Sequence, residues 1–405
     1  MTQRTGIFAG IRVIDCASFI AGPGAATILS DFGADVIKVE PPGTGDPYRY
    51  LYRLEPNPVS RKNYFWQLTN RNKRSLALNL KSASSSDILQ KLIKSADVFI
   101  VNFPPHVRRG LKLTYEDVSR INPKIIYADI SGYGEKGPEA DKPGFDVTAY
   151  WARTGLMNQA RDISAPPAFP VSGIGDHATA STLFSGIVTG LHRREKTGTG
   201  CHVSTSLIGE GAWAVGGWLQ AALDGAVPAK QMDRNSPHNA LINNYRTKDH
   251  RWLMLAFVSE DKDWPGFVSA LKRPDLLADQ RFTDSKTRRQ NAAILREILD
   301  EVFLTETVGY WREALDKVNV VFGVVQTLDE LATDPQLIAN DIIRPIQDGS
   351  DTASFTVDSP MKIAEEAKVQ PTPAPALGQH TAEILAELGY AGTEIETLRS
   401  GGVAA

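Results

Sequence analysis

The first 130 residues alternate between short apolar runs and helical segments, and this alternation constrains the fold more than any other feature. Five apolar runs predict buried strands: residues 11–16 (IRVIDC), 35–40 (DVIKVE), 76–80, 97–102 (DVFIVN) and 124–130 (KIIYADI). Helical spacing of apolar residues separates them at 23–32, 84–94 and 115–122. Nearly continuous apolar strands joined by helices are typical of a parallel sheet covered on both faces. We therefore expect an α/β fold.

The pattern changes at about residue 225, where the charge density rises. A strand at 252–257 is followed by helical segments at 262–271, 291–303 and 307–318. After residue 320 the chain returns to alternating strand and helix, and a final helix is expected at 378–388. The middle of the chain therefore predicts a smaller α+β domain.

Composition excludes several classes of function. With 44 Lys and Arg against 47 Asp and Glu, the net charge of −3 lacks the basic excess of nucleic-acid or anionic-membrane binders. The two cysteines form no CxxC motif, and the seven histidines show no metal-ligand spacing, so no metal site is expected. No secretory signal and no apolar run of transmembrane length is visible. We expect a cytoplasmic protein.

Two early segments bear on cofactor binding. The first strand–helix turn reads AGPGAATILSDFGA (21–34), which lacks the GxGxxG pattern, so a nicotinamide cofactor is not expected. The segment NRNKRS (70–75) holds three basic residues in six. It fits either a solvated surface turn or a site for a phosphate-bearing small molecule.

Asp176 lies in GIGDHATAS (173–181), directly before a helix-like segment of small residues. One interpretation is an N-cap, because aspartate at a helix start satisfies free backbone N–H groups. The other is a carboxylate nucleophile, because Gly173 and Gly175 allow the backbone to approach a ligand closely. The sequence leaves both interpretations open.

Several segments in order resemble class III coenzyme A (CoA) transferases, the CaiB/BaiF group. They are residues 10–40, NKRSLALNLK (72–81), ADVFIVNF (96–103), SGYGEKGP (131–138), KPGFDVTAY (142–150), GDHATAS (175–181), GLHRREKTGTGCHVSTSL (190–207) and TPAPALGQHTAEILAELGY (372–390). The resemblance covers nearly the whole chain. KPGFDVTAYWARTG and NSPHN (235–239) are most similar to the branch acting on 2-hydroxy acids such as 2-hydroxyisocaproate or phenyllactate.

The resemblance implies a discontinuous architecture and a dimer. A large Rossmann-like domain would comprise residues 1–205 and 325–405, and the small domain residues 225–320, with linkers at 206–224 and 320–330. Two chains would form a homodimer of interlocked rings. No nucleic-acid or membrane partner is implied.

The resemblance also implies a mechanism in which the family's nucleophilic aspartate falls on Asp176 and Asp146 faces it. Asp176 would attack an acyl-CoA to form a mixed anhydride and then an aspartyl-CoA thioester, which the acceptor acid reverses. The implied CoA contacts are Ile20, Ala21, Lys73, Arg74, Leu78, Asn79, Lys81, Asn102, Phe103, Arg108, Arg109 and Phe145.

The chain departs from the family pattern at three places. Ile20 replaces a glutamine of the formyl-CoA branch, and Arg108 and Arg109 are out of register with the usual arginine. The glycine-rich substrate loop of that branch is absent from 225–250, which argues against oxalate as the acceptor.

Three alternatives to transfer remain open. The first is a 2-methylacyl-CoA racemase of the same family, which carries GHD where this chain has GFD (144–146). Because Phe145 cannot exchange a proton, the sequence favours transfer. The second is a CoA-binding protein without catalysis, and the third is an acyl-CoA hydrolase.

Overall fold

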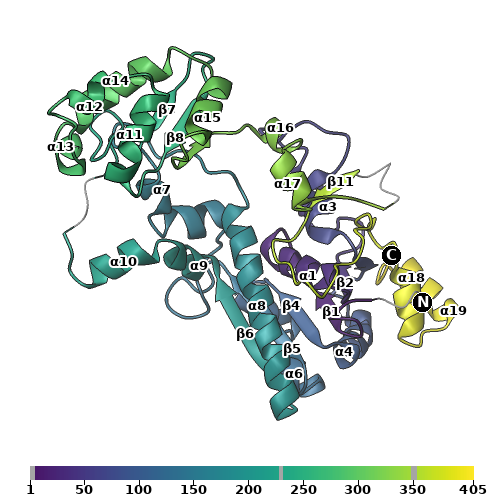
Figure 1. The fold of residues 1–405 in the computed structure, drawn as a ribbon. Coiled ribbons are helices and arrows are strands. Elements are labelled where there is room, and N and C mark those ends of the chain that lie inside the picture. The colour runs from purple at the N-terminus through teal and green to yellow at the C-terminus, as the bar shows by residue number, and fades with distance from the viewer. Residues whose placement is uncertain (1–4, 228–230, 348–353) are drawn as a thin grey trace. The chain divides into compact units, whose positions relative to one another are not determined.

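A six-stranded parallel sheet organises the larger of the two units into which the chain folds (Figure 1). The computed structural model describes residues 5–227, 231–347 and 354–405. Unit 1 comprises the described parts of 1–157, 169–226 and 335–405, and unit 2 those of 158–168 and 227–334.

The strand order of the sheet is β3-β2-β1-β4-β5-β6, and every neighbouring pair is parallel. The strands are β1 (Arg12–Asp15), β2 (Asp35–Glu40), β3 (Arg74–Ala77), β4 (Val98–Val101), β5 (Ile126–Ser131) and β6 (Cys201–Ser206). Val13 of β1 pairs with Val36 of β2 and with Val98 of β4. The chain therefore winds in opposite directions on either side of the β1–β4 pair, and ligands of such sheets bind beyond the carboxyl ends at this switch point.

Helices cover both faces of the sheet, which explains the nearly continuous apolar strands. One face packs against α1 (Ala21–Asp31) and α8 (Ile174–Thr197). The other packs against α4 (Ser86–Ser95), α6 (Tyr115–Ile121), α18 (Thr381–Glu387) and α19 (Gly392–Ser400). The predicted α/β fold is confirmed.

Several short elements were not expected from the sequence. In unit 1 they are α2 (Tyr48–Leu51), α3 (Tyr64–Asn70), η1 (Ala83–Ser85), α5 (Pro105–Leu111), the π-helix η2 (Asp146–Ala152), α7 (Leu156–Gln159) and α17 (Pro335–Ala339). Helix α19 also follows the helix that was expected to be the last. In the same unit, β10 (Ile343–Pro345) and β11 (Phe355–Val357) pair as an antiparallel sheet. Residues 206–224, predicted as a linker, carry α9 (Leu207–Ala214) and α10 (Gly216–Leu223). Helical periodicity is hard to detect in segments of four to eight residues.

Unit 2 is an α+β unit, as its sequence pattern indicated. An antiparallel sheet of β7 (Asn244–Arg246), β8 (Trp252–Leu255) and β9 (Phe322–Val324) packs with helices around one aromatic-rich core. The helices are α11 (Glu260–Ala270), α12 (Asp275–Ala278), α13 (Ser285–Gln290), α14 (Ala292–Phe303), α15 (Val308–Asp316) and α16 (Leu328–Leu331).

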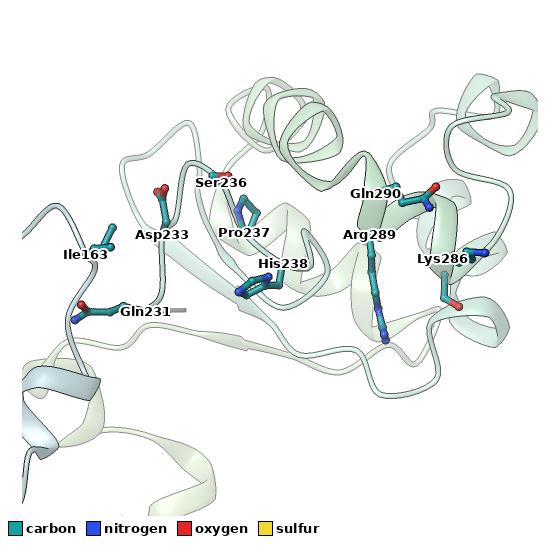
Figure 2. A pocket seen from close by; sticks show the side chains of 10 residues that line it. Ile163, Gln231, Asp233, Ser236, Pro237, His238, Lys286, Arg289 and Gln290 are labelled. Atoms are coloured by element: carbon teal, nitrogen blue, oxygen red, sulfur yellow. The ribbon is translucent and has the colours of Figure 1, made fainter. Parts of the chain in front are cut away.

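Unit 2 has a cavity of its own, of about 880 Å³. Figure 2 shows its lining, with Gln231, Asp233 and His238 on one stretch of chain and Lys286 and Arg289 on α13. None of the residues predicted to bind CoA lines this cavity.

No helix in the described ranges combines the length and the apolar character needed to cross a membrane.

Candidate active site

A cavity of about 310 Å³ lies in unit 1 beyond the carboxyl ends of the strands. Its lining comes from the turn after β1, the segment after β4, the end of β5, the loop before η2, the start of α8 and the start of α9. The residues are Ser18, Phe19, Ile20, Ala21, Asn102, Phe103, Pro104, Pro105, Ile130, Ser131, Gly132, Ala140, Lys142, Pro143, Gly144, Phe145, Asp176 and Leu207. This is the position that the strand order predicts for a ligand.

Asn102 ties two edges of the cavity together. Its Oδ1 accepts a hydrogen bond from the Ser18 N–H at 2.9 Å, and its Nδ2 donates to the Ser18 carbonyl at 2.8 Å. Asn102 follows β4, whereas Ser18 belongs to the turn after β1. The two bonds fix that turn against the neighbouring strand at the switch point.

Asp146 caps the helix that carries Asp176. Its Oδ2 accepts from the Gly173 N–H at 2.7 Å and its Oδ1 from the Gly175 N–H at 2.9 Å. These are amides at the start of α8, which have no partner within the helix. The Asp176 carboxylate has no hydrogen-bond partner among the described residues, so the N-cap interpretation of Asp176 is wrong.

The surroundings of Asp176 raise the pKa of its carboxyl group to about 7. Burial is the larger cause, and the negative charge of Asp146 is the second. Burial also raises the pKa of Asp146, while its bonds to the Gly173 and Gly175 amides oppose that rise. Two close carboxyl groups therefore differ in role: one is engaged with the backbone and one faces the cavity.

Gly175 permits the close approach of these groups. A Cβ at this position would lie 2.3 Å from Asp146 Oδ1 and 2.3 Å from Cγ of the Tyr150 ring. Gly173 adopts φ +95°, a conformation that favours glycine. The two glycines noted in the sequence thus serve the contact between η2 and α8.

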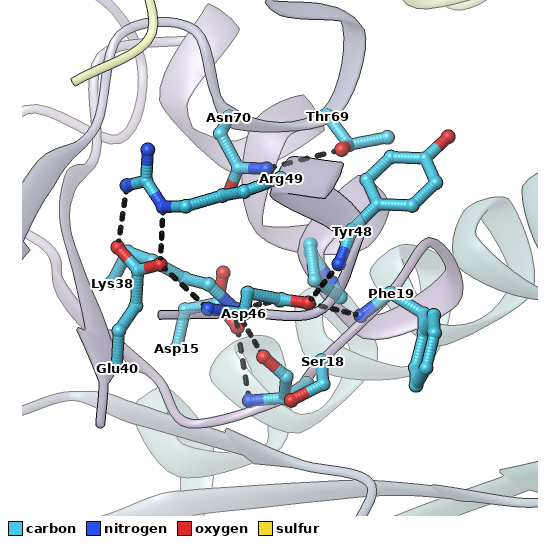
Figure 3. A network of polar contacts seen from close by, with 12 residues as sticks. Asp15, Ser18, Phe19, Lys38, Glu40, Asp46, Tyr48, Arg49, Thr69 and Asn70 are labelled. Carbon is cyan, nitrogen blue, oxygen red and sulfur yellow. Dashed lines mark hydrogen bonds and ion pairs between the residues drawn. The ribbon is translucent and has the colours of Figure 1, made fainter. Parts of the chain in front are cut away.

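A network of buried charges holds the first turn of the cavity (Figure 3). Asp46 Oδ1 accepts from the backbone N–H of Phe19 at 3.2 Å and of Tyr48 at 2.9 Å. Lys38 Nζ pairs with Asp46 Oδ2 at 2.9 Å and lies 3.9 Å from Asp15 Oδ1. Burial lowers the pKa of Lys38, but the surrounding carboxylates outweigh it and raise that pKa above its usual range. The lysine therefore stays charged and keeps Asp46 in place.

Phe19 is strained within this turn. It adopts φ +65°, which a side chain with a Cβ rarely does. Its ring meets the Phe145 ring edge to face, with centroids 5.5 Å apart, and both residues line the cavity. Strain of this kind persists where the surroundings enforce it, and here the bond to Asp46 does so.

Comparison with known proteins assigns this architecture to a family. The model of the family "CoA-transferase family III" matches residues 8–381. The chain belongs to CoA-transferase family III. The resemblance found in the sequence is thereby confirmed, and the protein is a CoA-transferase.

Individual relatives cover nearly the whole transferase. A (R)-2-hydroxy-4-methylpentanoate CoA-transferase of Clostridioides difficile is 34% identical, over 94% of this chain and 95% of the relative. A cinnamoyl-CoA:phenyllactate CoA-transferase of Clostridium sporogenes is 33% identical, over 98% and 97%. The crystal structure of a CAIB/BAIF family protein from Brucella suis has a TM-score of 0.84 at 26% identity, covering 95% of this chain and all of that one.

Five of the twelve predicted CoA contacts line the cavity with Asp176. They are Ile20, Ala21, Asn102, Phe103 and Phe145. Leu78 and Asn79 follow β3 and do not line it, although Asn79 is half-buried at the surface. Lys81 is exposed two residues further on.

Lys73 has a structural role in the transferase. It is buried, and its ammonium group donates to Asp15 Oδ2 at 2.8 Å, Asn70 Oδ1 at 3.1 Å and the carbonyls of Pro23 and Thr69 at 2.8 and 2.7 Å. Burial lowers the pKa of Lys73 to about 8. Because every donor is used internally, the predicted contact of Lys73 with CoA does not fit this structure.

Arg74 is likewise engaged within the protein. Its guanidinium pairs with Asp35 at 2.6 Å, Glu387 at 2.7 Å and Glu383 at 2.9 Å. These bonds join β3 to its neighbour β2 and to α18. The predicted contact of Arg74 with CoA is therefore not supported either.

Arg108 and Arg109 have different surroundings. Arg108 is buried, pairs with Glu135, and lies 3.6 Å from Asp129 Oδ2. Arg109 is exposed, 3.8 Å from Asp141. Lys142, which the sequence interpretation did not single out, lines the cavity and pairs with Glu139 at 2.7 Å. Its place in the loop after β5 is the signal that could have identified it.

Among the residues that the structure describes, Asp129, Glu135 and His202 form one group of potential metal ligands. Arg108 already pairs with Glu135 and lies near Asp129, and His202 bonds Asp129. The two carboxylates therefore already have the Arg108 guanidinium as their counter-charge, and His202 is held by Asp129.

Proposed function

We propose that this transferase moves CoA from an acyl-CoA donor to a carboxylic acid acceptor through covalent intermediates on Asp176. The observation that carries the proposal is the position of Asp176. Its carboxylate lines the cavity at the sheet's switch point and has no hydrogen-bond partner among the described residues. A carboxylate with free lone pairs in a partly dry site is a competent nucleophile.

The proposed reaction proceeds in four balanced steps. An Asp176 oxygen attacks the donor's thioester carbon and CoA leaves as thiolate, giving a mixed anhydride. The thiolate then attacks the aspartyl carbonyl carbon, which releases the donor acid and leaves an aspartyl-CoA thioester. The acceptor carboxylate attacks that thioester and expels the thiolate again. Attack of the thiolate on the acceptor's acyl carbon restores Asp176 and forms the new acyl-CoA, so the thioester energy is conserved.

Two helix starts support this chemistry. Asp176 lies in the first turn of α8, whose positive end favours negative charge. Ala21 begins α1 and lines the same cavity, and the first amides of a helix have no intrahelical acceptor. Such amides are suited to stabilising the oxyanions that each attack generates.

We assign the acid to the 2-hydroxy carboxylic acids. Two relatives at 33–34% identity over nearly the full chain bear the names of transferases for 2-hydroxy-4-methylpentanoate and phenyllactate. The cavity wall supports an apolar acid chain, since Phe19, Ile20 and Phe145 line it. For the phosphates of CoA, the candidate cations are Lys142, which lines the cavity, and Lys81 and Arg109, which are exposed.

A racemase of the same family would need two groups that exchange protons on opposite faces of the substrate carbon. Phe145 lines the cavity where such a group would be required and cannot provide it. Incubation with a chiral 2-methylacyl-CoA in deuterated water separates the alternatives. Transfer predicts no deuterium uptake without an acceptor acid, and uptake would overturn it.

We further propose that the transferase acts as a homodimer. Helices α9 and α10 expose Trp213, Trp218 and Leu223 by 83%, 64% and 73%. Large apolar side chains gathered on neighbouring helices are typical of a protein interface. Sedimentation of the double variant Trp213→Asp, Trp218→Asp should give a monomer where the wild type gives a dimer, and a monomeric wild type would contradict the proposal.

The test of the function is exchange of CoA between acid pairs, followed by mass spectrometry. Asp176→Asn should lose at least about a thousandfold in rate, because a covalent step disappears. Asp117→Asn is the matched control, since Asp117 also lies at the third position of a helix, α6, but is not among the residues that line the cavity. Exchange that survives Asp176→Asn would overturn the proposal. Thiol release without acceptor would instead indicate a hydrolase.

A further inference from the structure

Tyr48 carries a buried hydroxyl group that the fold itself does not use. The residue is only 1% exposed, yet its hydroxyl has no hydrogen-bond partner in the described part of the chain. Two other fully buried tyrosines behave normally: Tyr127 donates to the Leu113 carbonyl at 2.7 Å and Tyr245 to the Ala240 carbonyl at 2.6 Å. A buried polar group without a partner needs an explanation, and a bound ligand is one.

The ring of Tyr48 is sealed, but its oxygen is not. Some buried side-chain atoms, such as the Trp264 indole nitrogen, have neither a hydrogen-bond partner nor contact with solvent. The Tyr48 oxygen is not one of these atoms. The oxygen therefore borders a small accessible space. A group arriving in that space could accept its hydrogen bond.

Tyr48 lies behind the wall of the Asp176 cavity and is not itself among the residues that line it. Tyr48 packs in one apolar cluster with Ile20, which lines the cavity of Asp176. Its backbone N–H is bound by Asp46, and Figure 3 shows the hydroxyl at the far end of the ring, away from Asp46. After burial, the charge of Asp176 is the largest influence raising the pKa of Tyr48, ahead of that of Asp46. The charge of Asp176 therefore acts on the hydroxyl more strongly than that of Asp46, and the hydroxyl stays protonated as a donor.

Packing around Tyr48 restrains its side chain in one conformation. The Tyr48 ring stacks on the Phe65 ring, with centroids 5.3 Å apart and planes inclined by 16°. The next residue, Arg49, pairs with both Glu40 oxygens at 2.7 Å and lies 3.8 Å above the Trp66 ring. Little side-chain freedom remains to be lost when the hydroxyl gains a partner.

We propose that Tyr48 is a further catalytic residue, whose hydroxyl donates a hydrogen bond to a carboxyl oxygen of the acid that reacts at Asp176. This rests on the proposed function of Asp176. A hydroxyl bonded to a carboxylate makes a short, charge-assisted hydrogen bond, which would orient the acid for attack. Among the described residues, no carboxylate of the chain accepts a hydrogen bond from the Tyr48 hydroxyl, so this donor is available to the substrate acid.

Tyr48→Phe removes the hydroxyl and keeps the ring. Because no protein partner is lost, its unfolding midpoint in urea should equal that of the wild type. Its kcat/KM for CoA transfer should fall about 10- to 100-fold, the usual effect of removing a hydrogen bond to a charged group. Tyr245→Phe is the matched control. It leaves the Ala240 carbonyl in unit 2 without its hydrogen-bond donor, so it should lower the unfolding midpoint and leave kcat/KM unchanged.

The outcomes separate this proposal from the function on which it rests. A kcat/KM of Tyr48→Phe within twofold of the wild type, or a loss matched by a fall of the unfolding midpoint, overturns the role of Tyr48. If Asp176→Asn is inactive in that same assay, the proposed function still stands. If the wild type exchanges CoA between no 2-hydroxy acid pair, both fall together.

Discussion

Asp146 caps the helix that carries Asp176, and thereby leaves the Asp176 carboxylate unengaged. The cap comes from η2 in a distant part of the sequence, and it binds the amides of Gly173 and Gly175 with both of its oxygens. An aspartate at a helix start would ordinarily satisfy such amides itself. The protein has separated the structural carboxylate from the proposed reactive one.

Asp146→Ala should therefore reduce both stability and activity. The two amides would lose their acceptor, and losing a cap costs about 1–2 kcal/mol of unfolding free energy. Asp146→Asn keeps one acceptor oxygen and should cost less. Urea unfolding measures the difference, and equal stability of all three proteins would contradict the capping role.

The pH dependence of transfer should show a single acid limb near pH 7. The raised pKa of Asp176 keeps it protonated, and so not nucleophilic, below that pH. The rate should rise about tenfold per pH unit below 7 and level off above it. In Asp146→Asn the limb should move to lower pH, because a neighbouring negative charge is removed. A flat profile from pH 5 to 8 would exclude Asp176 as the titrating nucleophile.

The same pKa predicts a pH-dependent gain in stability for Asp176→Asn. The folded pKa of about 7 exceeds the unfolded value near 4, so the wild type loses stability as pH rises between these values. Asparagine does not titrate. At pH 8 the variant should be more stable by on the order of 1–2 kcal/mol, given partial exposure of the site, and at pH 4 equal. Thermal unfolding at both pH values tests this, and a variant less stable at pH 8 would refute it.

Gly175→Ala should disturb the site because the added methyl group would collide with its neighbours. Its Cβ would lie 2.3 Å from Asp146 Oδ1, so the cap must move, at a cost of about 1–3 kcal/mol. Gly110→Ala in α5 is the control, since its Cβ meets nothing within 4 Å and should stabilise the helix by about 0.5–1 kcal/mol. Opposite signs in denaturant unfolding are expected, and equal effects would contradict the steric account.

The fold was largely predictable from sequence because its strands are apolar on both faces. Val13 and Val98 lie in such runs, whereas their pairing, which sets the strand order, was not predicted and is seen only in the structure. The short helices around the site were not predictable, since α2 has only four residues and is held by tertiary contacts such as that between Arg49 and Glu40.

The sequence predicted the position of the site better than it predicted the roles of the individual residues there. The resemblance to the transferase family pointed to Asp176 and Asn102, and the structure places both at one cavity. Lys73 looked like a phosphate ligand because its buried partner Asp15 is 58 residues away in sequence. The cap by Asp146 and the unpartnered hydroxyl of Tyr48 also depend on contacts between distant segments, which no local pattern encodes.

The most direct test of the account is to trap the covalent intermediate. The wild-type transferase is incubated with a 2-hydroxyacyl-CoA, treated with hydroxylamine, digested and examined by mass spectrometry. The account predicts a hydroxamate on Asp176, which forms only with acyl-CoA and is absent from Asp176→Asn. Turnover without any adduct on Asp176, or an adduct on another residue, would contradict it.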